Sequence, residues 1–180
     1  DIFADFEVNT SPRLAALDGL SRVFYIGSFS KTLSASLRCG YIAAPIEWVE
    51  SLLDLKIATS FGGGQLAAAV ILSALTDSGY RKHMNTIHTR LANARAHTLS
   101  RLVKLDIMPW LLPRAGMFLW CRLPDNNSAT QLANRCLSKG VILAPGNAFS
   151  QSKNAENFIR FNVSQASDSR VFEVLEQSLN

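Results

Sequence analysis

Residues 25–45 read YIGSFSKTLSASLRCGYIAAP and place one lysine, Lys31, after an apolar run and between small hydroxylated residues. The run at residues 23–26, VFYI, has the continuous apolar character of a strand that is buried on both faces. We therefore expect Lys31 to emerge at the carboxyl end of a strand, where open α/β sheets bind their ligands. Arg38 follows seven positions later and adds a second cation to the same segment.

The side chains around Lys31 suit a ligand that carries both a carbonyl group and a phosphate group. A lysine amine beside another cation can lose its proton and attack a carbonyl carbon to form a Schiff base. Arg38 can offer a planar fork to a phosphate, and the hydroxyl groups of Ser28 and Ser30 can donate to the same anion. Pyridoxal 5'-phosphate combines the two groups. The competing interpretation is a solvated lysine after a strand, because single lysines are common on protein surfaces.

Two other lysine motifs do not fit this segment. A Walker A loop needs glycines where this chain has Tyr25 and Ser30. Residues 28–31 match the S-x-x-K pattern of serine acyl-enzymes, but neither S-D-N nor K-T-G follows in the sequence.

The composition indicates a folded α/β protein without a nucleic-acid-binding face of its own. Of the 180 residues, 48% are hydrophobic and 18% charged, which predicts a buried core. The net charge of +4 is scattered along the chain and forms no basic run. The three cysteines favour reduced, structural thiols in a cytoplasmic protein, and the three histidines lack metal-site spacing. The longest apolar stretch, at residues 65–75, is too short to span a bilayer.

Hydrophobic periodicity and turn residues predict the elements. Tyr80, Met84, Ile87, Leu91, Ala94, Thr98, Leu102 and Leu105 form one stripe on a long helix over residues 78–105. That helix divides a larger first domain, residues 1–95, from a smaller α/β domain, residues 96–180. Phe118 and Trp120 alternate on a strand and are expected in the core. Further strands are predicted within 21–30, 38–45, 116–123, 141–146 and 157–164, and helices at 46–59, 65–77 (deeply packed), 129–140 (ended by Gly140) and 166–179.

Residues 28–45, SFSKTLSASLRCGYIAAP, closely resemble the cofactor-lysine segment of class I/II aminotransferases, S-F-S-K-x-x-x-x-x-L-R-x-G-Y. The resemblance implies the PLP-dependent transferase fold type I, with residues 1–95 as the C-terminal part of the large domain and 96–180 as the small α/β domain. It also implies that Lys31 forms a Schiff base with pyridoxal phosphate. Ser28, Ser30 and Arg38 would then hold the phosphate.

The resemblance extends along the rest of the chain. Residues 113–124, PRAGMFLWCRLP, and 141–149, VILAPGNAF, are similar to two small-domain motifs of the same family, although Ala115 replaces a usual glycine. Residues 158–164, FIRFNVS, resemble the segment whose arginine pairs with the substrate carboxylate. This similarity makes Arg160 the expected carboxylate fork, a bidentate task that suits arginine better than lysine.

The first residues, DIFADFE, resemble the family's E-D-D-x-Y-x-D-F block upstream of the lysine, in either of two registers. In one register, Asp1 is the aspartate that pairs with the pyridinium nitrogen and keeps it protonated. In the other, that aspartate precedes Asp1, and Phe3 takes the place of a tyrosine that hydrogen-bonds the cofactor. The abrupt start suggests a piece of a longer polypeptide.

The same block, the Leu37-Arg38 pair and the serine-rich SASLRCGY look most like MocR-type transcriptional regulators of the GntR family. That resemblance implies a cytoplasmic homodimer in which the chain senses an amino acid or amine, while an upstream winged-helix domain binds DNA. A metabolic aminotransferase that converts an amino acid to a 2-oxo acid is the alternative. Fold does not decide between them, so whether the protein is an enzyme stays open. A cofactor-free interaction domain is a third interpretation, which the retained lysine, serines and arginines disfavour.

Overall fold

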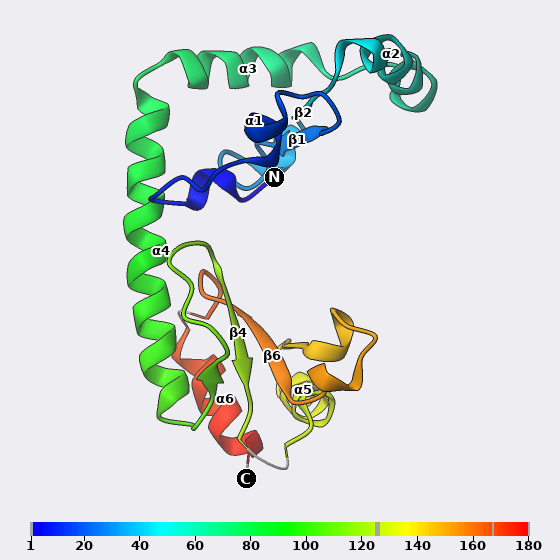
Figure 1. The fold of residues 1–180 in the computed structure, drawn as a ribbon. Helices are drawn as coiled ribbons and strands as arrows, with labels where there is room; N and C mark the ends of the chain where they lie inside the picture. The colour runs from blue at the N-terminus through cyan, green and yellow to red at the C-terminus, as the bar shows by residue number, and fades with distance from the viewer. Residues whose placement is uncertain (1, 125–126, 167, 180) are drawn as a thin grey trace. The chain divides into compact units, whose positions relative to one another are not determined.

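A computed structural model describes residues 2–124, 127–166 and 168–179. The chain forms two compact units, Asp1–Ile87 (unit 1) and His88–Asn180 (unit 2). The division falls within the long helix α4, Gly79–Val103 (Figure 1). The domain boundary expected near residue 95 stays a prediction.

Unit 1 consists of a two-stranded antiparallel sheet with helices before and after it. Strands β1 and β2 pair from Tyr25 opposite Ala43 to Ser28 opposite Gly40. Both strands and the two helices that follow them confirm the predicted elements, whereas the short helix α1 was not predicted. The elements are η1 (Ala4–Phe6), α1 (Leu14–Asp18), β1 (Tyr25–Ser28), η2 (Ala35–Leu37), β2 (Gly40–Ala43), α2 (Ile46–Ser60) and α3 (Gln65–Thr76).

The burial expected in unit 1 is wrong for both β1 and α3. Ile26 of β1 is 58% exposed, and in α3 only Ile71 is buried while Leu66 is 79% exposed. A strand is buried on both faces only when other elements cover both faces. In the described part of the chain β1 pairs with β2 alone, and residues of α2 line one open hollow beside the two strands.

Unit 2 is built on a four-stranded antiparallel sheet in the order β3-β4-β6-β5, so β6 lies between β4 and β5. The strands at 116–123 and 157–164 and both helices were predicted, whereas β3 was not. The elements are β3 (Met108–Pro109), β4 (Phe118–Arg122), α5 (Ala129–Ser138), β5 (Ala144–Pro145), η3 (Gly146–Ala148), η4 (Lys153–Ala155), β6 (Phe158–Asn162) and α6 (Ser169–Leu179). Gly140 follows α5 with a φ of +81°, as a helix-ending glycine should.

The core of unit 2 collects apolar side chains from the sheet and three helices. Leu102 of α4, Leu132 of α5, Leu175 of α6, Leu119 of β4 and Ile159 of β6 are all fully buried. The stripe predicted on the long helix is confirmed for the seven members that lie in α4, none of which is exposed, whereas Leu105 follows the end of the helix.

The expectation that Phe118 and Trp120 belong to the core is wrong. In β4 it is Leu119 and Cys121 that are fully buried, while Phe118 and Trp120 are only partly buried. Successive side chains of a strand point to opposite faces, so the two rings lie on the other face of the sheet. That face therefore carries aromatic side chains away from the core.

Candidate functional site

Lys31 lies on a turn in the first part of the loop that connects β1 and β2. The backbone amides of Leu33 and Ser34 both donate to the carbonyl of Phe29, at 2.9 and 3.2 Å. The amide of Phe29 donates to the carbonyl of Cys39 at 3.1 Å, which continues the pairing of the two strands beyond Ser28. The side chain of Lys31 is exposed on this turn.

The two serines that flank Phe29 are in direct contact. The hydroxyl of Ser28 lies 3.1 Å from Oγ of Ser30 and 3.5 Å from the carbonyl of Cys39, and its one hydrogen can serve either acceptor. The backbone amide of Ser30 donates to Oγ of Ser28 at 3.2 Å. The structure thus brings together the hydroxyls of Ser28 and Ser30, two of the side chains predicted to bind the phosphate.

Arg38 lies at the other end of the same loop, after the short helix η2. It adopts the left-handed region, with φ 47° and ψ 42°, which costs a residue with a side chain about 1–2 kcal/mol. Its guanidinium is exposed and makes only a long contact, from Nη1 to the carbonyl of Ala35 at 3.5 Å. The guanidinium therefore keeps most of its donors for a ligand.

Thr32, next to Lys31, is buried, and its carbonyl contacts a side chain of α4. Nε2 of His83 donates to the carbonyl of Thr32 at 2.8 Å. Tyr80, also on α4, donates to a carboxylate oxygen of Asp5 at 2.9 Å. Burial raises the pKa of Tyr80, and Asp5 reinforces this effect. Sequence reasoning missed His83, because nothing in its spacing marks a contact with a loop some 50 residues earlier.

The groups present in unit 1 fit pyridoxal phosphate by their chemistry. An exposed primary amine, two neighbouring hydroxyls and a guanidinium with free donors lie on one loop, as an aldehyde-bearing phosphate ester requires. Asp1, the expected partner of the pyridinium nitrogen, lies outside the described residues. Phe3, the residue of the alternative register, is exposed and contacts the ring of Phe6.

Arg160 lies in unit 2, on the inner strand β6, and its guanidinium packs against two aromatic rings. The Cζ atom is 4.1 Å from the ring centroid of Phe149 and 4.4 Å from that of Phe118. In the described residues the guanidinium makes no hydrogen bond and no ion pair. Phe149 belongs to the VILAPGNAF segment, whose similarity to the family motif was the signal that could have identified it.

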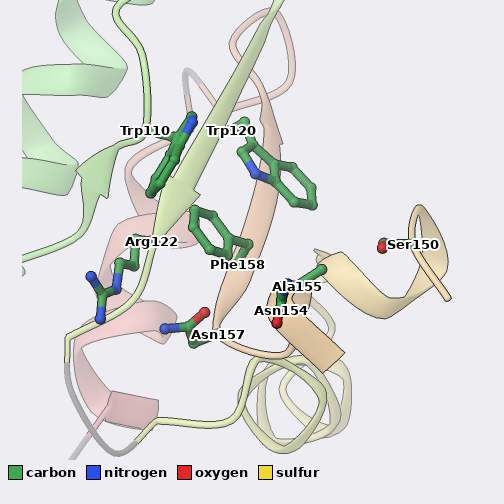
Figure 2. Close-up of a pocket in the computed structure, with 8 residues that line it drawn as sticks. All are labelled: Trp110, Trp120, Arg122, Ser150, Asn154, Ala155, Asn157 and Phe158. Carbon is green, nitrogen blue, oxygen red and sulfur yellow. The ribbon is translucent and has the colours of Figure 1, made fainter. Parts of the chain in front are cut away.

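An aromatic cluster lies beside Arg160 on the same face of the sheet. Trp120 stacks on Phe158 with centroids 5.3 Å apart, and Trp110 meets the edge of Phe158 at 5.6 Å. These rings line a hollow of about 580 Å³ together with Arg122 and Asn157. Figure 2 shows the side chains that line it. Trp120 also contacts the edge of Phe149 at 5.9 Å, which links the cluster to Arg160.

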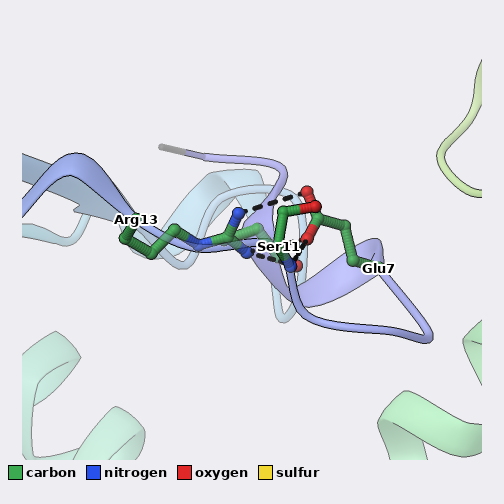
Figure 3. Close-up of polar contacts among 4 residues, drawn as sticks. Glu7, Ser11 and Arg13 are labelled. Carbon is green, nitrogen blue, oxygen red and sulfur yellow. Dashed lines mark hydrogen bonds and ion pairs between the residues drawn. The ribbon is translucent and has the colours of Figure 1, made fainter. Parts of the chain in front are cut away.

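An ion pair ties the first residues of unit 1 together (Figure 3). Arg13 contacts both carboxylate oxygens of Glu7, at 3.1 and 3.2 Å, and the amide of Ser11 donates to the same carboxylate at 2.8 Å. The hydrogen bond from Arg13 is the main reason that the pKa of Glu7 is lowered from its usual value of 4.5.

The described residues contain no group of three or more histidine, cysteine or acidic side chains that could hold a metal ion. Among the same residues, no helix combines the length and apolar character needed to cross a membrane.

Comparison with solved structures defines the fold as that of PLP-dependent type I aminotransferases. The chain superimposes on the α-aminoadipate aminotransferase LysN of Thermus thermophilus with a TM-score of 0.87 and 24% identity, over 99% of this chain and 48% of LysN. It matches the kynurenine aminotransferase of Pyrococcus horikoshii with a TM-score of 0.82 and 26% identity, over 97% of this chain and 44% of that enzyme. The fold class predicted from the sequence is confirmed.

The chain belongs to the aminotransferase class I and II family, whose family model matches residues 1–177. Membership of this family implies pyridoxal phosphate as the cofactor. Its curated relatives include the HTH-type transcriptional regulator YdfD of Bacillus subtilis, 32% identical over 93% of this chain and 35% of YdfD. The HTH-type regulator NorG of Staphylococcus aureus is 32% identical over 79% of this chain and 33% of NorG. The chain spans about a third of the length of these relatives.

Proposed function

We propose that this chain is part of the effector-sensing domain of a transcriptional regulator of the GntR/MocR type. The observation that carries the proposal is the identity of about a third to proteins named HTH-type regulators, along nearly the whole chain. In the proposed protein, an upstream winged-helix domain reads DNA while the aminotransferase-like domain binds a cofactor and an amino compound.

Unit 1 supplies the groups that hold pyridoxal phosphate in this proposal. Lys31 provides the amine that bonds to the cofactor's aldehyde carbon, since its side chain is exposed on the loop after β1. Ser28, Ser30 and Arg38 donate to the phosphate, and Asp1 is proposed as the partner of the ring nitrogen. When bound, the cofactor would withdraw electrons from the α-carbon of an amino compound.

Unit 2 supplies the group that selects a carboxylate-bearing ligand. Arg160 offers a planar fork that makes no hydrogen bond and no ion pair in the described residues, and the two oxygens of a carboxylate match its geometry. We propose an amino acid, rather than a simple amine, as the preferred ligand.

A metabolic aminotransferase is the second candidate function. It is favoured by the solved structures that the chain resembles, which are aminotransferases, and by the retained Lys31. In that reaction the amine of Lys31, once free, would carry the proton away from the substrate's α-carbon.

We propose that the parent protein is a cytoplasmic homodimer. The exposed apolar side chains of α2, α3 and the segment between them, such as Ile46, Phe61 and Leu66, are the surface that a second copy would cover. Sedimentation of the parent protein tests this assembly: a dimer that Leu66→Asp converts to monomer is expected. A wild-type monomer would contradict it.

The regulator proposal is tested with the parent polypeptide and the DNA upstream of its own coding sequence. We expect a mobility shift whose affinity changes on addition of pyridoxal phosphate and an amino acid, and no such response in Lys31→Ala. Formation of a 2-oxo acid at several turnovers per second, with no DNA binding, would support the enzyme instead.

A further inference from the structure

Arg160 of β6 packs against two aromatic rings, with its Cζ atom 4.1 Å from the ring centroid of Phe149 and 4.4 Å from that of Phe118. A guanidinium interacts favourably with a ring face at such distances, by about 0.5–2 kcal/mol per contact depending on desolvation. Its five N–H donors all lie in the plane of the group and point outward from it. Contact with the two rings uses none of these donors, so they remain for hydrogen bonds to a ligand.

The two rings come from different elements and are fixed independently. Phe118 lies on β4, where it pairs with Asn162 of β6, so it is the diagonal neighbour of Arg160 on the same face of the sheet. Phe149 follows η3, and its amide donates to the carbonyl of Gly146 at 2.9 Å.

Gly146 is itself required by the backbone around it. It is buried, and a Cβ atom at this position would overlap the carbonyl oxygen of Ala155. The turn that begins at Gly146 can therefore hold the ring of Phe149 against Arg160 only with glycine there. Trp120 supports the same ring from its edge, with centroids 5.9 Å apart.

We propose that Phe118 and Phe149 are positioning residues that hold the guanidinium of Arg160 in the orientation needed to bind a ligand carboxylate. This inference rests on the proposed role of Arg160. The rings act on the ligand through Arg160, so the preference for a carboxylate-bearing ligand depends on both of them. They restrict the rotation of a long side chain before the ligand arrives, so less conformational entropy is lost on binding.

The test uses the full-length parent protein loaded with pyridoxal phosphate and two probes, L-alanine and ethylamine, which differ by one carboxylate. Calorimetric titration gives the affinity ratio of the two probes. We expect the wild type to prefer L-alanine by about tenfold or more, as hydrogen bonds to a charged group predict. Phe149→Leu and Phe118→Leu should each lower this preference about threefold to tenfold by weakening L-alanine alone. Phe149→Tyr, which keeps the ring, should restore it.

Phe158→Leu is the matched control, because Phe158 is an aromatic residue of the same strand whose ring contacts Trp110 and Trp120. It should change both affinities equally, as a general loss of packing would. A wild-type ratio near 1 would contradict the role of Arg160 itself. A large wild-type ratio that both leucine variants retain would contradict only the positioning role. If a leucine variant unfolds, Phe149→Tyr is compared with Phe149→Met instead. An equal preference for L-alanine over ethylamine in these two variants would overturn the inference.

Discussion

Unit 1 and unit 2 are similar in length but differ in how their apolar residues are used. In unit 2 the sheet and the helices α4, α5 and α6 enclose a core whose central members, such as Leu119 and Ile159, are fully buried. In unit 1 the buried apolar residues are Phe6, Ile71 and Met84, while most apolar side chains of α2 and α3 are exposed. The apolar residues therefore form a closed core in unit 2, whereas in unit 1 most of those on α2 and α3 form an exposed surface.

The largest expected contrast between the units concerns their cysteines. Burial raises the pKa of Cys121 in unit 2 from 9.0 to about 12, which lowers its thiolate fraction about a thousandfold, whereas Cys39 in unit 1 is partly exposed. In the folded chain we expect iodoacetamide to modify Cys39 and to spare Cys121 and Cys136. Peptide mass spectrometry before and after denaturation checks this. Modification of Cys121 at the rate of Cys39 would show that unit 2 is not closed.

Truncation of apolar side chains should separate the units almost as sharply. Ile159→Ala removes a fully buried side chain and should lower the free energy of unfolding of the 180-residue chain by about 3 kcal/mol. Leu66→Ala removes a side chain that is 79% exposed and should change it by less than about 0.5 kcal/mol. Urea unfolding measures both values. In the parent protein Leu66→Ala should cost more, because a second copy would cover this side chain in the proposed dimer.

Two glycines offer a smaller contrast of the same kind. A Cβ at Gly146 would overlap the backbone of Ala155, so Gly146→Ala should cost about 1–3 kcal/mol of unfolding free energy. Gly63 in unit 1 has no atom within 4 Å of an added Cβ, so Gly63→Ala should be nearly neutral. Thermal unfolding of the two variants is the measurement. Equal losses would mean that packing around Gly146 is no tighter than around Gly63.

The smallest effect is expected from the exposed ion pair of unit 1. Because the folded-state pKa of Glu7 lies below 4.5, its ionised form favours folding; this contribution is complete above pH 4.5 and is lost as pH falls through the lowered value. Glu7→Gln should therefore weaken the pH dependence of the urea midpoint below pH 4.5. Near pH 7, the slope of the midpoint against pH should be the same in the variant and the wild type. A wild-type midpoint that is insensitive to this pH range would contradict the pairing with Arg13.

Sequence patterns predicted most elements of both units because periodicity and turn residues are local signals. They failed on burial in β1 and α3, where the outcome depends on what covers each face rather than on the strand or helix itself. They also assigned Phe118 and Trp120 to the wrong face, since an alternation of apolar residues in FLWCR does not say which set is inward.

The same distinction applies to the candidate site. The loop residues Ser28, Ser30, Lys31 and Arg38 are close in sequence, so a motif could identify them. Contacts between distant residues, such as His83 with Thr32 or Phe149 with Arg160, needed the folded chain.

The central claim is that the amine of Lys31 bonds to pyridoxal phosphate, and reduction with borohydride tests it most directly. The parent protein is incubated with pyridoxal phosphate, reduced, digested and mapped by mass spectrometry, with Lys31→Arg as the control. We predict one phosphopyridoxyl group per chain, on Lys31, and none at that position in the control. An unmodified Lys31, with label absent or spread over other lysines such as Lys56 and Lys82, would contradict the account.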